Sequence, residues 1–225
     1  TTWDLDNKKD GGNGKGGKPT QVLPKPGKLE SPFKSSVEGQ ALLNQVADFY
    51  NETLKDSAEG KNYLQKRGLK NSEIIDHFKL GLANRTLCYR LPEKTRKTGE
   101  ELRANLQELG VLRETGHEHF SGSLVIPIFD EKGNVVEMYG RKIRDDLRKG
   151  TAYHLYLPGP HKGVWNFSCL AASKEVILCE ALIDALTFWC FGFHNVTSSY
   201  GVNGFTKDHL EAFKRYGVER VLIAY

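Results

Sequence analysis

The sequence predicts a protein of mixed class, α/β and α+β, in which a helical and mixed N-terminal part precedes a parallel βαβαβ unit. Three observations predict this. Apolar residues recur at helical spacing over much of residues 37–109. Short apolar runs separated by polar turns follow in residues 124–157. From residue 173, apolar strands alternate with helices, and such connections indicate a parallel sheet.

The composition is that of a soluble globular protein. Of the 225 residues, 27% are charged and 39% hydrophobic, which excludes collagen-like, membrane and wholly disordered classes. The sequence has no apolar run long enough to span a bilayer and no secretory signal near Thr1, so we expect a cytoplasmic protein without a membrane partner. The single methionine is Met138, and we therefore expect a fragment of a longer chain.

Cysteine spacing argues against a metal or disulfide framework. None of the four cysteines forms a C-x-x-C pair, and no histidine lies at zinc-finger distance from them. Cys179 and Cys190 lie in apolar runs, where a thiol behaves as a small hydrophobic group. We expect reduced thiols.

Residues 1–36 are rich in glycine, lysine and proline and carry no repeating apolar pattern. Such a segment cannot bury enough apolar surface to offset its ordering entropy. We interpret it as a flexible linker that joins a domain upstream to the rest of the chain.

Helices are expected at residues 37–55, 59–69, 71–78 and 102–109. Gly68 is placed to end the second of these. Strands are expected at residues 124–129, 135–139 and 154–157, with a turn over 130–134 joining the first two. Pro127 indicates an edge strand or a bulge, because proline cannot donate to a ladder.

The parallel unit is expected to contain strands 175–179, 195–199 and 221–225 and helices 181–191 and 206–216. The strands are almost continuously apolar, which predicts a sheet covered on both faces.

Ligands of an open parallel sheet collect at the carboxyl ends of its strands. Glu180 directly follows the first strand, and Asp184 lies one helical turn later, so both carboxylates can face the same edge. Such a pair suits a hard cation such as Mg²⁺, although acids are also favoured at any helix N-terminus. Gly201 and Asn203 lie in a loop that could offer N–H groups to a phosphate, or could be a plain connection.

Basic residues cluster between residues 141 and 163. This segment has six lysines and arginines against two aspartates, a surplus of +4 that equals the net charge of the whole chain. The candidates for phosphate binding here are Arg141, Lys142, Arg144, His161 and Lys162. The cluster is typical of a phosphate-bearing partner, and a solvated basic loop is the alternative.

The order of short motifs resembles the bacterial DnaG-type primase family, whose RNA polymerase core contains a Rossmann-like Toprim domain. The motifs that carry the resemblance are residues 61–69, 78–83, 126–130, 139–141, 161–163 and 180–184, and the likeness runs from about Val46 to Tyr225.

The resemblance implies a DNA primase, which synthesises RNA primers on single-stranded DNA from ribonucleoside triphosphates. It implies a Mg²⁺ (or Mn²⁺) site at Glu180, with Asp184 supporting it, and phosphate contacts from Arg141 and Lys162. Zinc is implied only for an upstream domain attached through residues 1–36, and a replicative helicase is a further expected partner. The implied domains are a primase core at 37–172 and a partial Toprim domain at 173–225.

The sequence departs from the family pattern at four places. Ala181 replaces a glycine, Ala152 replaces a lysine, and Ser121-Gly122-Ser123 stands where the family has arginines. The family's Asp-x-Asp after the third strand would lie beyond Tyr225. These departures favour a plasmid or mobile-element relative, and the fragment alone is expected to be inactive. A Toprim nuclease and a non-catalytic nucleic-acid-binding accessory protein remain as alternatives.

Overall fold

The computed structural model describes Phe33 and residues 39–225. The predicted linker therefore lies outside the described residues, with the exception of Phe33. That side chain is buried, and its ring centroid lies 5.9 Å from that of Phe49. The range assigned to the linker thus contains at least one residue of the folded core.

Four of the five described helices of the first part form at or near the positions that the apolar spacing predicts. They are α1 (Gly39–Lys55), α2 (Ala58–Lys66), α3 (Glu73–His77), α4 (Leu87–Arg90) and α5 (Lys97–Glu108). Ser57 caps α2 by accepting a hydrogen bond from the Gly60 N–H, and Gly68 follows its end at φ +80°. Helix α5 begins five residues before its predicted start. The four-residue α4 was not predicted.

Four strands form an antiparallel sheet in the order β1-β2-β3-β4. Their bounds are Gly81–Ala83, Ser123–Phe129, Val135–Lys142 and His154–Tyr156. Pro127 lies in an interior strand, but β1 pairs only with residues 123–125 of β2. At Pro127 the strand therefore has a neighbour on one side only, and the register shifts nearby, between Ile128 and Phe129. The expected edge position and the expected bulge are thus both confined to the residues around Pro127.

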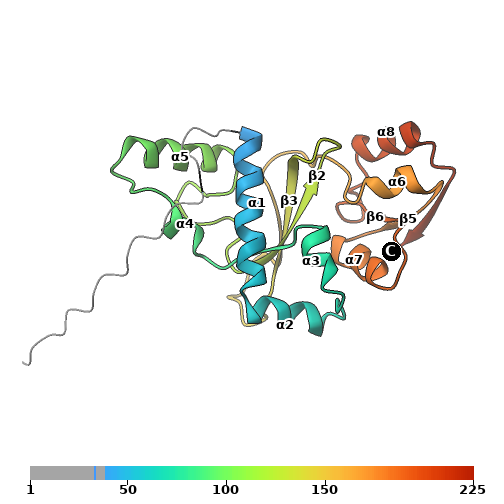
Figure 1. Ribbon diagram of the computed structural model, residues 1–225, viewed down its shortest axis with the longest axis horizontal. Helices are drawn as coiled ribbons and strands as arrows, with labels where there is room; N and C mark the ends of the chain where they lie inside the picture. The colour runs from blue at the N-terminus through green and yellow to red at the C-terminus, as the bar shows by residue number, and fades with distance from the viewer. Residues whose placement is uncertain (1–32, 34–38) are drawn as a thin grey trace, which may run out of the picture.

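The second part contains a parallel sheet in the order β6-β5-β7. Its elements are α6 (Ser168–Ala172), β5 (Glu175–Cys179), α7 (Leu182–Cys190), β6 (Val196–Ser198), α8 (Lys207–Tyr216) and β7 (Arg220–Ala224). Apart from the short α6, these agree with the predicted βαβαβ unit. We call α1 to β4 the antiparallel lobe and α6 to β7 the parallel lobe (Figure 1).

The prediction that the parallel sheet is covered on both faces is correct for β5 and β6 and wrong for β7. Among the residues that the structure describes, β7 is an edge strand that pairs with β5 alone, and Ile223 is 71% exposed. An apolar sequence thus identified the strand correctly, but not its burial.

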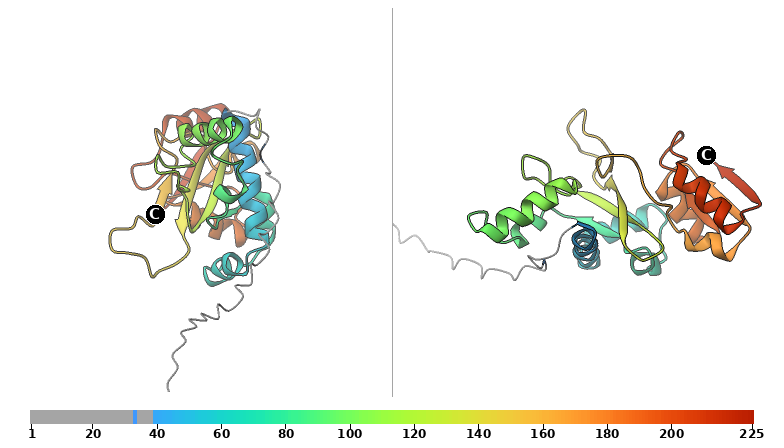
Figure 2. Two further views of the ribbon diagram at one scale, coloured as in Figure 1. Left: turned by 90° about the vertical axis from the view of Figure 1, so that its left-hand side faces the viewer. Right: turned by 90° about the horizontal axis from the view of Figure 1, so that it is seen from above.

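One hydrophobic cluster joins the two lobes. It includes Leu64 of α2 and Ile126 of β2, together with Cys179 of β5 and Leu186 of α7. Figures 1 and 2 show the lobes side by side, with α1 packed on the antiparallel sheet and the connection between β3 and β4 projecting from the body. The shared core holds the two sheets in a fixed relation. All four cysteines are free thiols, as expected.

Candidate active site

The carboxyl end of β5 presents the two predicted carboxylates. Glu180 directly follows the strand and is half-buried, and Asp184 lies exposed in the first turn of α7. Neither side chain makes a hydrogen bond or ion pair with any residue that the structure describes. Two unpaired carboxylates with solvent access are a donor set that fits Mg²⁺, which prefers oxygen ligands and retains several waters. Within the described part of the chain, no group of three or more potential ligands forms.

The loop after β6 is joined through its backbone to the main chain at the end of β5. The Gly201 N–H donates to the Glu180 carbonyl at 3.0 Å, and the Gly204 N–H donates to the Gly201 carbonyl at 2.9 Å. The Gly201 N–H is therefore already engaged within the protein, which at this residue favours the alternative of a plain connection. Asn203 is exposed at the tip of the loop.

Tyr200, from the same loop, ties the parallel lobe to the basic segment. Its hydroxyl donates to the carbonyls of Lys162, at 2.6 Å, and Gly163, at 3.0 Å. Its ring stacks on His161, with centroids 4.6 Å apart. Lys162 itself is exposed and has no ion-pair partner among the described residues. These contacts bring Lys162 to the edge of the sheet that carries Glu180.

Glu137 anchors the other side of this loop. The carboxylate is 2% exposed and accepts hydrogen bonds from the N–H groups of Met138, at 2.9 Å, and Leu157, at 3.0 Å. It also pairs with His161 Nδ1 at 3.1 Å. Burial raises the pKa of Glu137, and the hydrogen bond from His161 opposes that shift. His161 is thus held in place by the buried Glu137 carboxylate and by the stacked ring of Tyr200.

Arg141 lies near the end of β3, between α2 and β4. Its Nε donates to the Tyr63 hydroxyl at 3.3 Å, and its Nη1 is 2.8 Å from His154 Nε2. Burial raises the pKa of the neighbouring Tyr139 to about 12, and the charge of Asp184 adds to this effect.

A separate groove of about 860 Å³ runs along the basic segment. Its lining includes two acids, Glu118 and Asp146, and five cationic side chains: Arg85, Arg113, Lys142, Arg144 and Arg148. Arg85 and Arg113 were not predicted. They come from connections far apart in the sequence, and only the fold places them beside Lys142. Ser121-Gly122-Ser123 stands where the family has arginines, but the groove is still rich in positive charge. Arg85 lies beside this segment, because its Nε donates to Ser121 Oγ at 3.0 Å.

Two predicted cations of this groove are partly committed to the protein. Lys142 Nζ donates to the Ser121 carbonyl, and burial, with Arg113 and Arg85 nearby, lowers the pKa of Lys142. Arg144 is exposed, and its Nε and Nη2 donate to the two carboxylate oxygens of Asp146. Arg144 therefore offers less net charge to a ligand than its sequence position indicates.

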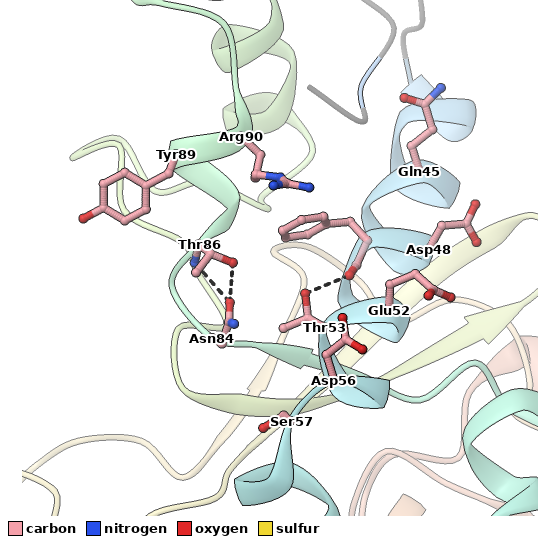
Figure 3. Close-up of a pocket in the computed structure, with 11 residues that line it drawn as sticks. Gln45, Asp48, Glu52, Thr53, Asp56, Ser57, Asn84, Thr86, Tyr89 and Arg90 are labelled. Carbon is pink, nitrogen blue, oxygen red and sulfur yellow. Dashed lines mark hydrogen bonds between the residues drawn. The ribbon is translucent and has the colours of Figure 1, made fainter. Parts of the chain in front are cut away.

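The hollow between α1 and α4 has the opposite character. Its lining includes Asp48 and Glu52 of α1, Asp56 directly after it, and Arg90 of α4 (Figure 3). Its volume of about 840 Å³ is similar to that of the basic groove. A lining of this charge repels phosphate, so we exclude it as a nucleic-acid site.

Comparison with known proteins agrees with this arrangement. Residues 49–159 match the N-terminal domain of the DNA primase catalytic core, and residues 177–225 match a Toprim-like domain. The DNA primase of Helicobacter pylori strain J99 is 29% identical over 204 residues, covering 84% of this chain and 34% of the relative. The DNA primase of Haemophilus influenzae is 27% identical over 216 residues, covering 88% and 34%. The chain thus spans about a third of the length of these curated relatives.

Solved structures show the same fold. A DnaG catalytic core superposes with a TM-score of 0.67 at 21% identity, over 83% of this chain and 61% of the other. A DnaG primase catalytic domain bound to single-stranded DNA gives 0.68 at 21% identity, over 83% and 60%. The Aquifex aeolicus primase, with its zinc-binding and RNA polymerase domains, gives 0.66 at 21% identity, over 85% and 49%.

The two sheets and the two matched segments define a primase-type catalytic core followed by a Toprim-like domain. The chain is a homologue of the bacterial DnaG-type DNA primases. None of the helices in the described part of the chain has the length and apolarity needed to cross a bilayer.

Proposed function

We propose that this chain forms the catalytic face of a DNA primase, which joins ribonucleotides on a single-stranded DNA template by metal-dependent nucleotidyl transfer. The observation that carries the proposal is the pair of hydrogen bonds from the Tyr200 hydroxyl to the carbonyls of Lys162 and Gly163. They join the loop of Lys162, whose ammonium has no ion-pair partner among the described residues, to the loop after β6, the strand beside the one that ends at Glu180. Phosphoryl transfer needs cations for the phosphates and carboxylates for a metal in one place.

The residues have separate roles in this proposal. Glu180 and Asp184 would hold Mg²⁺ or Mn²⁺, which when bound supplies a Lewis acid that offsets the charge of the triphosphate. Lys162 and Arg141 bind phosphates of the nucleotide or template, and His161 and Tyr200 fix the loop of Lys162. Asn203, at the exposed tip of its loop, is a further candidate for a phosphate contact.

The basic groove is proposed to hold the template. Its cations lie along one hollow, and nucleic-acid affinity comes chiefly from neutralised phosphates. A cytoplasmic setting and contact with a replicative helicase remain predictions that accompany this function.

The test of catalysis is Glu180→Gln in the protein as its gene encodes it. This change keeps the size of the side chain and removes its charge, so primer synthesis on single-stranded DNA should fall to background. Oligonucleotide affinity and its salt dependence should be unchanged, because a carboxylate neutralises no phosphate. Glu219→Gln is the matched control, because Glu219 is exposed just before β7, at the opposite end of the parallel sheet.

Three outcomes are informative. Primer synthesis by the Glu180→Gln protein would show that the metal site is wrongly placed. DNA binding without primer synthesis in the unsubstituted protein would favour the accessory alternative. Cleavage of the oligonucleotide would favour the nuclease.

A further inference from the structure

His154 lies between two functional groups of β3. Its Nε2 is 2.8 Å from Arg141 Nη1, and its Nδ1 is 2.7 Å from the Tyr139 hydroxyl. A guanidinium group only donates hydrogen bonds, so Nε2 must be the acceptor. In the neutral imidazole the proton is then on Nδ1, which donates to Tyr139. The contact with Arg141 therefore requires the neutral form of His154.

Arg141 is held from the opposite side as well. Its Nε donates to the Tyr63 hydroxyl of α2, and the ring of Tyr63 in turn carries the Arg67 guanidinium 5.6 Å from its centroid. The guanidinium also interacts with the Tyr139 hydroxyl. Because a guanidinium has five N–H donors, these contacts still leave donors for a ligand. A guanidinium that is already oriented loses less conformational entropy when it binds a phosphate.

We propose that His154 is a positioning residue for Arg141: the neutral imidazole holds the guanidinium in the orientation that binds a template phosphate, and protonation of the imidazole releases it. Template binding is then coupled to pH. This inference rests on the proposed function, in which Arg141 contacts phosphate. No family motif named above includes His154.

The charged and titratable groups around the imidazole come from three elements. They are Tyr139 and Arg141 of β3, Tyr63 and Arg67 of α2, and Asp184 of α7, whose charge acts through Tyr139. Partial burial, followed by the charges of Arg141 and Arg67, lowers the pKa of His154 below its ordinary value. The imidazole is therefore neutral at neutral pH. Only in acid does it become a cation, which cannot accept from Arg141 and repels it.

The experiment measures binding of a twelve-nucleotide oligothymidylate by the 225-residue chain and its variants between pH 5 and 8. Neither the phosphodiesters nor the thymines titrate in this range, so changes arise in the protein. At pH 8, His154→Ala should weaken binding about fivefold, whereas His154→Gln, which keeps an acceptor, should stay within about twofold. At pH 5 the unsubstituted protein should bind the oligonucleotide about fivefold more weakly than His154→Gln, because only the imidazole becomes a cation that repels Arg141.

The comparison with His154→Gln cancels the titration of other histidines, including His161. His154 is exposed, so its variants should fold, and circular dichroism verifies this. Tighter binding by the unsubstituted protein than by His154→Gln at pH 5 would make the imidazolium a phosphate contact itself and overturn the proposal. Equal affinity of His154→Ala and the unsubstituted protein at every pH would also overturn it.

Arg141→Ala separates this inference from the proposed function. If Arg141→Ala weakens binding and lowers the salt slope by about one phosphate contact while the His154 variants do nothing, only the positioning role is wrong. If Arg141→Ala also leaves affinity and salt slope unchanged, the phosphate contact of the proposed function fails, and the inference fails with it.

Discussion

In the antiparallel lobe, Glu118 and Glu137 are buried, and each accepts hydrogen bonds from backbone N–H groups. In the parallel lobe, Glu180 and Asp184 reach solvent and have no hydrogen bond or ion pair within the described part of the chain. Burial raises the pKa of both Glu118 and Glu137, whereas the other two stay accessible to a cation. The same side-chain chemistry thus supports the architecture in one lobe and is left available for ligands in the other.

The largest expected contrast is between Glu137→Ala and Glu180→Ala. Removing the Glu137 carboxylate takes this acceptor from the Met138 N–H, leaves the Leu157 N–H only its longer bond to the Met138 carbonyl, at 3.3 Å, and leaves His161 without its acidic partner. We expect the free energy of unfolding to fall by about 3 kcal/mol. Glu180→Ala should change it by less than about 0.5 kcal/mol, because no described partner is lost.

Urea denaturation followed by circular dichroism measures both values from the shift in midpoint at constant slope. Glu137→Gln is the control for size and retains an acceptor for Leu157. A loss for Glu180→Ala as large as that for Glu137→Ala would mean that Glu180 is also a structural residue, and the comparison between the lobes would collapse.

The sequence predicted the parallel lobe more fully than the antiparallel one for a physical reason. Strand β5 and helices α7 and α8 are regular, apolar on the buried side and bounded by polar loops, so local patterns locate Glu180 and Asp184. The three-residue strand β1 and the four-residue α4 are too short to show a period, and tertiary contacts determine them.

The charged and hydrogen-bonding partners at the candidate site are the other feature that local sequence patterns could not predict. The basic segment identified Lys142, but Arg85 and Arg113 reach the same groove from loops with no periodic signal. The role of Tyr200 was hidden for the same reason, since its partner carbonyls at Lys162 and Gly163 are nearly forty residues away. Such contacts depend on how the two sheets pack together.

Two glycines allow the backbone of the two site loops to be compared. Gly163 and Gly201 have positive φ values, +79° and +92°, and each lies in a loop of the candidate site. A Cβ at Gly163 would lie 2.7 Å from Val136 Cγ2 and 3.1 Å from Ile128 Cγ2, whereas at Gly201 no atom lies within 4 Å. The loop of Lys162 is thus packed against the antiparallel sheet at Gly163, whereas the loop after β6 is open at Gly201.

Gly163→Ala should therefore destabilise the protein by about 3 kcal/mol, from backbone strain and overpacking together. Gly201→Ala should cost about 1 kcal/mol, from strain alone. Thermal unfolding of the two variants at one pH measures the difference. Equal losses would mean that the methyl groups of Val136 and Ile128 yield to the added Cβ, and that the Lys162 loop is less constrained than its contacts indicate.

The smallest effect concerns Glu118 and depends on pH. Its carboxylate accepts from the Leu87 N–H at 2.9 Å and from the Tyr50 hydroxyl at 3.3 Å, and burial raises its pKa above the ordinary value. A folded-state pKa above the unfolded one means that the protonated acid stabilises the fold. That contribution is complete below the unfolded pKa, near 4.3, and is lost as pH rises through the raised folded-state value.

Glu118→Gln keeps an acceptor for Leu87 but cannot ionise, and its amide can donate to the Tyr50 hydroxyl. Relative to the unsubstituted protein, this variant should therefore gain stability as pH rises from about 4 to neutrality, by about 1 kcal/mol in total. Urea denaturation at several pH values measures this difference, and a constant difference between Glu118→Gln and the unsubstituted protein across the range would show that ionisation of this buried acid costs the fold nothing.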